Sequence, residues 1–467
     1  MNANLQASQE SYRLIVTRRG ATELLLSANG PSHCLPKASV RPGERLADQL
    51  VQAIRNNFGL EAYCLFVTGF SRTPEGVRPA RHAVMESVAE NGGAPARTSW
   101  VSTNSAYREI ALPSDESEGL GRSLEELSRY AAESCKRPFA KPGWIRELFR
   151  WSQDQIEPLE LRLTGRFQQL NASPSFSLIR IETTGPALWF KATGEPNIHE
   201  LTVTCTLTRL FPSYVPELLS VRPPWNGWLS RECPGETLDT FTDVSAWTRT
   251  AETLARLEIA SIGKRRELLA CGCRDLTPTA LASRIDRFLA RTSERMTLQR
   301  SEPPAILSNS DLAFLRDELQ RACSTLEDLG LPDVLGHIDF NPGNIVVSPG
   351  KCVFLDWAEG AVVSPFITFS YFREHALRGL TDAAEAHEQI ARAYLDPWRS
   401  LLPRSDIVRG MAVSSIVAVF AYALTVDEQT PPADPETPAS AGFLRSLARR
   451  MHREALGING RSELCRH

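Results

Sequence analysis

The sequence predicts an α+β protein of three parts: a mixed α/β domain in residues 1–150, a small β-rich lobe in residues 151–240, and a helical lobe in residues 241–467. Three observations predict this class. A strand hairpin precedes an amphipathic helix in the first part, apolar residues alternate with polar ones in the second, and apolar residues recur at helical spacing in the third. A chain of 467 residues is long enough to form more than one hydrophobic core.

The first part begins with a predicted hairpin. Residues 14–19 and 23–27 are strand-forming runs on either side of a turn that contains Gly20. An amphipathic pattern over 46–58 predicts a helix that ends at Gly59, because glycine readily adopts the left-handed conformation that closes many helices. Further strands are expected over 63–70 and 83–88, and a further helix over 124–134.

The second part carries strand signals around one lysine. Residues 176–183 alternate apolar and polar, and residues 187–191 form a second strand that ends at Lys191. Residues 197–210 are compatible with a helix that has Glu200 near its start. Two further strands are predicted over 216–221 and 228–235.

Helical periodicity begins at Val244 and continues to Ile262. Further helices are predicted over 279–290, 310–329, 382–402 and 407–426, the second of these with Ser310 as its N-cap. A proline-rich loop over 430–442 is expected before a last short helix. We interpret four arginines of that helix as a solvated face and not as a nucleic-acid-binding patch: Arg445, Arg449, Arg450 and Arg453.

One polar loop carries the residues that point to chemistry. Asp339 and Asn344 are five positions apart, and a turn at 342–343 can point both side chains into one cavity. A hairpin is predicted over 345–355, with Asn344 at its entrance and Asp356 at its exit. The pattern therefore gathers two carboxylates and one amide around one hairpin.

These side chains fit the transfer of a phosphoryl group. The reaction needs a carboxylate that orients the attacking hydroxyl and accepts its proton, and oxygen ligands for the Mg²⁺ that neutralises the nucleotide phosphates. We assign the first role to Asp339. Asn344 would supply a neutral amide oxygen to the metal, and Asp356 an anionic ligand. The sequence therefore predicts a kinase that uses a nucleotide and Mg²⁺.

The pattern His-x-Asp-x-x-x-x-Asn, followed by a hydrophobic strand that ends in Asp, resembles the aminoglycoside phosphotransferase family, relatives of choline kinases and protein kinases. His337, Asp339, Asn344 and Asp356 occupy every position, and Trp357 follows where protein kinases have Phe. The resemblance implies a bilobal protein-kinase-like fold and transfer of the γ-phosphoryl group of ATP to a hydroxyl of a small molecule. It also implies that His337 braces the loop. The alternative is a polar turn with a buried aspartate that caps a hairpin.

The same resemblance assigns Lys191 and Glu200 to nucleotide binding, with the glutamate holding the lysine against the phosphates, while Asn344 and Asp356 bind the nucleotide through the metal. The alternative is a surface lysine and a glutamate that only favours the helix dipole. The loop expected to cover the phosphates, residues 169–175, contains no glycine, which departs from the family pattern. A pseudokinase or a nucleotide-binding regulatory protein therefore stays an alternative.

The first 150 residues resemble the Nudix fold. With the last glycine of the Nudix motif placed on Gly59, three other positions match: Leu60, Ile54 and Glu44. The catalytic positions do not match and carry Ala38, Gln52, Ala53, Asn56 and Asn57. Because neutral amides hold Mg²⁺ far more weakly than carboxylates, we expect a Nudix-like α/β/α scaffold without hydrolase activity. An unrelated α/β domain and a Nudix hydrolase with an accessory domain are the alternatives.

Composition indicates a soluble protein of the cytoplasm. The net charge is −3 at pH 7, no apolar stretch approaches the roughly 20 residues of a membrane helix, and the first ten residues lack the apolar core of a signal peptide. The expected partners are a nucleotide and a small hydroxylated substrate, and neither nucleic acid nor a membrane. The ten cysteines are expected to be reduced and mostly buried, and Cys271 and Cys273 are too close for a usual pair of metal ligands. The sequence indicates neither the acceptor nor the oligomeric state.

Overall fold

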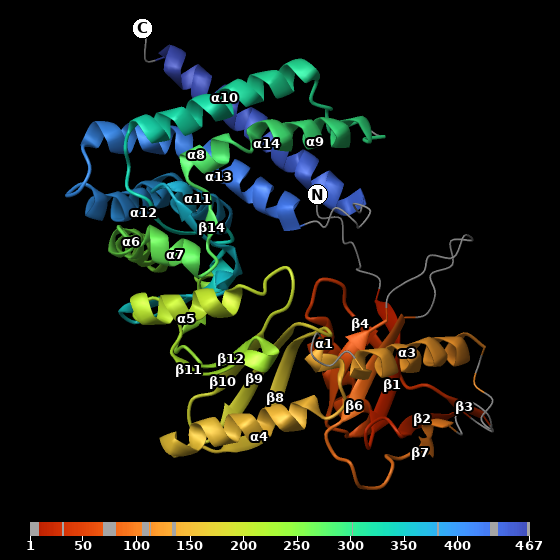
Figure 1. Cartoon of the computed structure of the whole chain (residues 1–467). Helices are drawn as coiled ribbons and strands as arrows, with labels where there is room; N and C mark the ends of the chain where they lie inside the picture. Colours follow the sequence, from red (N-terminus) through yellow and green to blue (C-terminus); the bar gives the residue numbers. More distant parts are fainter. Residues whose placement is uncertain are drawn as a thin grey trace. The chain divides into compact units, whose positions relative to one another are not determined.

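The computed structural model describes residues 9–29, 32–68, 81–104, 112, 114–132, 137–300, 302–380, 383–429 and 438–464 (Figure 1). The chain forms two compact units. Unit 1 comprises Met1–Leu201 and Glu217–Glu232, and unit 2 comprises Thr202–Pro216 and Cys233–His467. Sheets and many helices make the structure α+β, as predicted. The division into three parts at residues 150 and 240 stays a prediction.

The first sheet of unit 1 is mixed. Its strands are β1 (Glu10–Arg18), β2 (Glu23–Asn29), β3 (Ser32–Cys34), β4 (Lys37–Val40), β5 (Ala62–Val67), β6 (Arg81–Ser87) and β7 (Thr98–Ser102). The main order is β3-β2-β1-β6-β5, with β4 on β1 and β7 on β2. β1 and β2 form the predicted antiparallel hairpin, whereas β1 and β6 are parallel. The strands predicted over 63–70 and 83–88 are confirmed as β5 and β6, with residues 69 and 70 outside the described part of the chain.

The helix α1 (Leu46–Phe58) has the bounds that the amphipathic pattern predicts. Gly59 closes it at a φ of 65°, and its N–H donates to the carbonyl of Arg55. Asn56 and Asn57 are exposed on the outer face. The inner face buries Ala47, Leu50, Val51 and Ile54. The helix is confirmed, whereas its Nudix identity stays a prediction. A longer helix, α3 (Ser114–Ala132), includes most of the predicted range 124–134.

The second sheet of unit 1 has the order β11-β12-β10-β9-β8. Its strands are β8 (Leu163–Ala172), β9 (Ser177–Thr183), β10 (Leu188–Ala192), β11 (Leu218–Arg222) and β12 (Gly227–Arg231), and every neighbouring pair is antiparallel. Buried and half-buried residues alternate along β9 and β10, so Phe190 faces the core and Lys191 the opposite side. The strands predicted for this region are confirmed.

The helix α4 (Trp144–Ile156), which the sequence analysis missed, joins the two sheets of unit 1 in one core. Trp144 packs edge-on against Tyr63 of the first sheet, with ring centroids 5.9 Å apart. Its neighbour Phe139 packs against Phe190 of the second sheet at 6.2 Å. These aromatic contacts cross from one sheet to the other, and α4 runs through residue 150, where the sequence suggested a border.

Unit 2 contains two three-stranded sheets. One has the order β13 (Glu236–Thr237), β16 (Ile345–Ser348), β17 (Lys351–Phe354), and the other has the order β14 (Arg274–Asp275), β18 (Gly360–Val363), β15 (Val334–His337). The hairpin predicted over 345–355 is confirmed as β16 and β17, with Val346 opposite Val353. The second sheet was not predicted, because its strands are too short to show an alternating pattern.

Helices form the rest of unit 2: α5 (Glu200–Leu210), whose first two residues belong to unit 1, α6 (Val244–Ala260), α7 (Arg265–Ala270), α8 (Pro278–Ala282), α9 (Ile285–Thr297), α10 (Asn309–Asp328), α11 (Ile367–Gly379), α12 (Ala383–Trp398), α13 (Arg404–Gln429) and α14 (Pro438–Leu464). The predicted helices over 244–262, 310–329, 382–402 and 407–426 are confirmed with shifted ends, residue 382 lying outside the described part. The single helix over 279–290 is wrong. A turn in which Arg284 N donates to Leu281 O separates α8 from α9.

The start of α10 differs from the prediction that Ser310 caps it. Ser308 is the N-cap, because its hydroxyl accepts from Asp311 N at 3.2 Å while the Asp311 carboxylate accepts from Ser308 N at 2.8 Å. This reciprocal pair is a capping box, which satisfies two backbone N–H groups at once. Ser310 therefore lies inside the helix.

The last helix also differs from the prediction. α14 has 27 residues and is not short. Three of the four arginines do not form a solvated face: Arg445 donates to the carbonyl of Arg295 at 3.2 Å, Arg450 pairs with Glu374 at 3.2 Å, and Arg449 donates to a main-chain carbonyl at 2.6 Å. Arg453 is exposed, as predicted. Long arginine side chains reach acceptors on neighbouring elements, which periodicity alone does not reveal. Of the proline-rich loop, residues 430–437 lie outside the described part of the chain.

One helix in the described part of the chain, over Arg404–Glu428, is long and apolar enough to cross a membrane by length and composition. The prediction that no apolar stretch approaches the length of a membrane helix is therefore wrong. Within an apolar 18-residue stretch of this helix, 67% is buried inside the protein. α13 contacts α10, α11 and α14, so apolar residues on several of its sides are buried against neighbouring helices.

A carboxyl group is buried between α6 and α12, two helices that pack along each other. Glu258 is completely buried and accepts a hydrogen bond from the Tyr394 hydroxyl. Burial raises the pKa of Glu258 to about 8, because a charged carboxylate is poorly solvated there.

Candidate functional site

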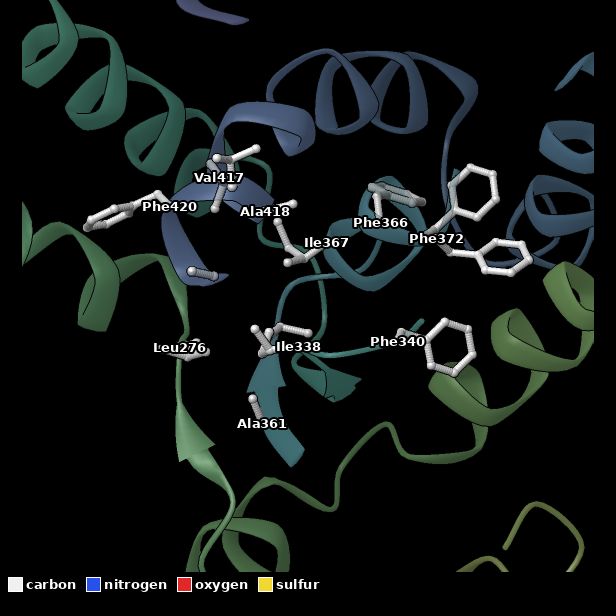
Figure 2. Close-up of a cluster of buried hydrophobic side chains, with 14 of the residues drawn as sticks. Leu276, Ile338, Phe340, Ala361, Phe366, Ile367, Phe372, Val417, Ala418 and Phe420 are labelled. Carbon is white, nitrogen blue, oxygen red and sulfur yellow. The ribbon is translucent and has the colours of Figure 1, made fainter. Parts of the chain in front are cut away.

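The loop after β15 orients Asp339 by burying its two neighbours. Ile338 is 3% exposed and Phe340 is fully buried, and both belong to the apolar cluster of unit 2 shown in Figure 2. Ile338 N also donates to Glu359 O at 3.0 Å. Because both neighbours are fixed in the core, the half-buried Asp339 carboxylate lies where it can meet a ligand.

His337 is buried at the end of β15, next to this loop. Its Nε2 lies 2.9 Å from Leu355 O, and since a carbonyl can only accept, Nε2 donates. The main-chain N–H of His337 donates to Thr368 Oγ1 at 3.1 Å. Its ring packs against Trp357 and Phe340, with centroids 4.8 and 5.7 Å away. These contacts agree with a bracing role.

Asn344 contacts Asp339 directly. Its Nδ2 donates to Asp339 O at 3.1 Å and lies 3.4 Å from Asp339 Oδ2. A turn of 3₁₀ helix, Pro342–Asn344, makes this possible, because the Asn341 side chain accepts from Gly343 N at 3.1 Å. The Nδ2 contacts leave the amide oxygen Oδ1 of Asn344 as an acceptor for another group.

Asp356 follows β17 and is exposed. Its backbone has a φ of 60° and a ψ of 63°, the left-handed region that few residues other than glycine, asparagine and aspartate adopt. The preceding residue, Leu355, donates its N–H to Asn344 O at 2.8 Å. Unit 2 thus links three predicted site residues through described contacts: Asp339 to Asn344, and Asn344 to the residue before Asp356.

Lys191 and Glu200 form an ion pair in unit 1. The lysine side chain is 13% exposed and that of the glutamate 2%. Lys191 Nζ also lies 5.8 Å from the centroid of the Trp228 ring. The pair is therefore mostly buried, and the interpretation as a surface lysine with an unrelated glutamate is wrong.

Residues 169–172 of the glycine-free segment belong to β8 and not to a loop, and a tight turn at Ser173–Phe176 joins β8 to β9. Ser173 N donates to Phe176 O at 3.1 Å, and Phe176 N donates to the Ser173 hydroxyl at 2.9 Å. These two N–H groups are used inside the turn. They are not available to a phosphate in this conformation, unlike the N–H groups of a glycine-rich loop.

Sequence reasoning missed one residue of the site. Tyr371, on α11, donates its hydroxyl to Asp339 Oδ1 at 3.4 Å. Burial, followed by the charge of Asp339, raises the pKa of Tyr371. Its ring lies 4.9 Å from His375 and 5.4 Å from Tyr422. The only signal was the aromatic content of 366–372, which predicts core packing as readily as a site.

The donor set fits a hard cation held together with phosphates. Among the described residues, no group of three His, Cys, Asp or Glu side chains is arranged to hold a metal. Mg²⁺ usually keeps several waters and binds through one or two protein oxygens plus substrate phosphates. The Asn344 amide oxygen and the Asp356 carboxylate are ligands of that kind.

No family model and no curated protein matches the chain. Among solved structures, an ethanolamine kinase of Plasmodium vivax is similar, with a TM-score of 0.48 and 14% identity over 72% of this chain and 96% of that one. A choline kinase of Streptococcus pneumoniae has a TM-score of 0.45 and 13% identity over 66% of this chain and 99% of that one. A macrolide 2′-phosphotransferase of Brachybacterium faecium has a TM-score of 0.43 and 15% identity over 65% of this chain and 98% of that one. These scores and identities are low, so function rests on the chain's own residues.

Proposed function

We propose that this protein is a kinase of small molecules that transfers the γ-phosphoryl group of ATP to a hydroxyl group. One observation carries the proposal: Asn344 contacts the carboxylate of Asp339 in a loop that the core fixes on both sides. A carboxylate held in a defined direction beside oxygen ligands is what phosphoryl transfer requires.

In this mechanism Asp339 orients the acceptor hydroxyl and takes its proton as the phosphoryl group is transferred. Tyr371 and Asn344 each contact one carboxylate oxygen, at 3.4 Å, which restricts rotation of the side chain. His337 holds the base of the loop through Leu355 O. Preorganised groups of this kind avoid the reorganisation cost that flexible groups incur in the transition state.

The resident metal would be held by Asn344 and Asp356. When bound, Mg²⁺ neutralises charge on the transferred phosphoryl group and its neighbours. Lys191 is the residue of unit 1 that would bind the nucleotide phosphates, with Glu200 fixing its ammonium group. ATP and Mg²⁺ are thus the proposed cofactors, and a small hydroxylated molecule is the proposed partner.

A second candidate function is nucleotide binding without turnover. The turn at Ser173–Phe176 favours it, because the N–H groups of Ser173 and Phe176 are bonded inside the turn and do not face a phosphate. Weak cover over the phosphates lowers nucleotide affinity and lets water compete with the acceptor. This candidate predicts a measurable dissociation constant for nucleotide and no ADP release with any acceptor.

For residues 1–150 we propose a Nudix-like scaffold without hydrolase activity. Asn56 and Asn57 are exposed neutral amides on α1, where the Nudix motif has carboxylates. Addition of nucleoside diphosphate compounds to the full chain should release neither phosphate nor nucleoside monophosphate. Release that persists in Asp339→Ala would instead assign hydrolysis to these residues.

The decisive experiment measures ADP release from ATP and Mg²⁺ over a panel of amino alcohols, sugars, aminoglycosides and macrolides. The Asp339→Asn variant serves as the matched control. Acceptor-dependent ADP release that the variant lacks supports the kinase. Equal release by both proteins, or nucleotide binding without release over the whole panel, contradicts it.

A further inference from the structure

A pair of thiols in unit 2 lies outside the proposed phosphoryl-transfer site. Several cysteines in the described part of the chain have free thiols. Two of them, Cys271 and Cys273, flank Gly272, whose φ is 110°, and their sulfur atoms are 3.9 Å apart. A disulfide needs about 2.05 Å, so small side-chain rotations of two neighbouring CH₂–S arms bridge the difference.

The two thiols differ in exposure and in acidity. Cys271 is half-buried, whereas Cys273 is 5% exposed. A hydrogen bond from the Cys273 thiol lowers the pKa of Cys271 against the opposing effect of burial. In the thiol form Cys271 donates to Leu268 O at 3.0 Å. Burial raises the pKa of Cys205 instead. Cys271 thus combines partial exposure with a lowered pKa, and the thiolate is the form that attacks disulfides.

We propose that Cys271 and Cys273 form a reversible disulfide, with low-molecular-weight disulfides such as oxidised glutathione as the oxidant. The Cys271 thiolate attacks one sulfur of oxidised glutathione, and one glutathione thiolate leaves. The Cys273 thiol loses its proton to solvent and attacks the Cys271 sulfur of the mixed disulfide. The second glutathione thiolate leaves. One protein dithiol and one oxidised glutathione thus give one protein disulfide and two reduced glutathiones.

Contacts connect this pair to the loop of Asp339. A Cβ placed on Gly360 would lie 3.4 Å from Cys273 Sγ, so this sulfur packs against the Gly360 backbone. Gly360 is the register partner of His337 in the β15–β18 pair. Arg274, next in sequence, pairs with Glu359 at 3.5 Å, and the carbonyl of Glu359 accepts from Ile338 N.

Oxidation draws the Cys273 sulfur toward Cys271 and thereby changes how this sulfur packs against Gly360. It therefore disturbs the strand that supports Ile338 and, through it, Asp339. This consequence rests on the proposed kinase function, whereas disulfide formation itself does not. Because a displacement of about 1 Å at a catalytic group can lower a rate by about 100-fold, we expect kcat of the oxidised protein to fall by roughly tenfold or more.

Trypsin gives a direct assay, because cleavage after Arg266 and Arg274 releases both sulfurs in one peptide without another cysteine. The full-length protein is treated with oxidised glutathione, its remaining thiols are alkylated, and the peptide is weighed. We expect loss of two hydrogen atoms and no alkylation, both reversed by dithiothreitol. In Cys271→Ser and in Cys273→Ala the disulfide should be absent, whereas Cys205→Ser, a half-buried thiol on α5, should behave as wild type.

A peptide that stays doubly alkylated, or that stops at a mixed disulfide on Cys271, overturns the proposal. Turnover is then measured on the reduced and oxidised forms of wild type and Cys271→Ser. Loss of turnover only in oxidised wild type supports the coupling to the Asp339 loop, and equal turnover of its two forms contradicts it. If the reduced protein has no kinase activity, the proposed function fails while the disulfide result stands.

Discussion

The side-chain amide of Asn344 contacts Asp339 twice, at the main-chain carbonyl 3.1 Å away and at the carboxylate oxygen Oδ2 3.4 Å away. One amide group therefore fixes both the backbone and the side chain of the proposed base. In the proposed mechanism its remaining oxygen would bind the metal ion. The residue would then couple the orientation of the proposed base to the occupancy of the proposed metal site.

Replacing Asp339 by Asn should lower kcat by roughly 10²–10⁴-fold, because an amide accepts no proton from the acceptor hydroxyl. Nucleotide affinity and the unfolding temperature should stay close to wild type, since the shape of the side chain is kept. Steady-state ADP release and calorimetric nucleotide titration measure the two effects. Asp333→Asn is the control, because Asp333 pairs with Arg265 in a partly exposed ion pair at 2.9 Å. Unchanged turnover in Asp339→Asn removes the kinase assignment.

At position 356 the effect of the side-chain charge can be tested separately from the effect of the backbone conformation. Asparagine tolerates the left-handed region, so Asp356→Asn should fold normally but lose Mg²⁺-dependent nucleotide binding. Asp356→Ala should lose the same binding and also about 1–2 kcal/mol of stability, from the strain of alanine at positive φ. Nucleotide titrations with Mg²⁺ and with EDTA, together with thermal unfolding, distinguish them. Equal Mg²⁺ dependence in Asp356→Asn and wild type would show that 356 is not a ligand.

Lys191→Met leaves the buried carboxylate of Glu200 without its ammonium partner. Removing one member of a buried ion pair costs about 3–5 kcal/mol, so the unfolding temperature should fall. In the double variant Lys191→Met/Glu200→Gln stability should largely return, because no uncompensated charge remains. Nucleotide affinity should stay low in both variants if Lys191 binds phosphates. Recovery of affinity along with stability would make the pair purely structural.

Tyr371→Phe removes one of the two side-chain contacts to the Asp339 carboxylate. The contact is long, at 3.4 Å, so we expect a fall in kcat of about three- to tenfold with little change in the KM for ATP. An effect on KM for the acceptor alone would instead indicate substrate contact by the ring. Comparison of kcat and both KM values decides between these roles.

The buried Glu258 predicts how stability depends on pH. Its pKa is raised from 4.5 to about 8, so the folded state keeps a proton that the unfolded state releases. The free energy of unfolding should therefore decrease as the pH rises from 4.5 toward 8. Glu258→Gln keeps a neutral partner for Tyr394 and should flatten this part of the profile. Thermal unfolding of both proteins across this range is the measurement, and identical profiles would contradict the buried-carboxyl explanation.

The parts of the site that could be predicted are local in sequence. Asp339, Asn344 and Asp356 flank one hairpin, and short turns fix such geometry with few long-range contacts. The pairing of Lys191 with Glu200, nine positions apart, was implied by the resemblance to the phosphotransferase family and not by the strand and helix pattern alone. Their roles in catalysis and in nucleotide and metal binding stay predictions, since contacts alone do not reveal chemistry.

The parts that could not be predicted depend on distant segments. Tyr371 reaches Asp339 across 32 positions, from a helix whose apolar pattern is that of an ordinary core element. β15 and β18 are too short to show alternation, although they form the sheet that carries His337. Arg445 and Arg450 of α14 were misjudged for the same reason, because their acceptors lie on other elements.

The left-handed backbone at Asp356 has a consequence for how this protein can change over generations. The residues that fit there most easily are aspartate, asparagine and glycine, and only the first of them carries a charge. A single nucleotide change from an aspartate codon can give either of the other two. The proposed catalysis could therefore be lost in one step without loss of the fold, which would open a short evolutionary route from an enzyme to a non-catalytic descendant.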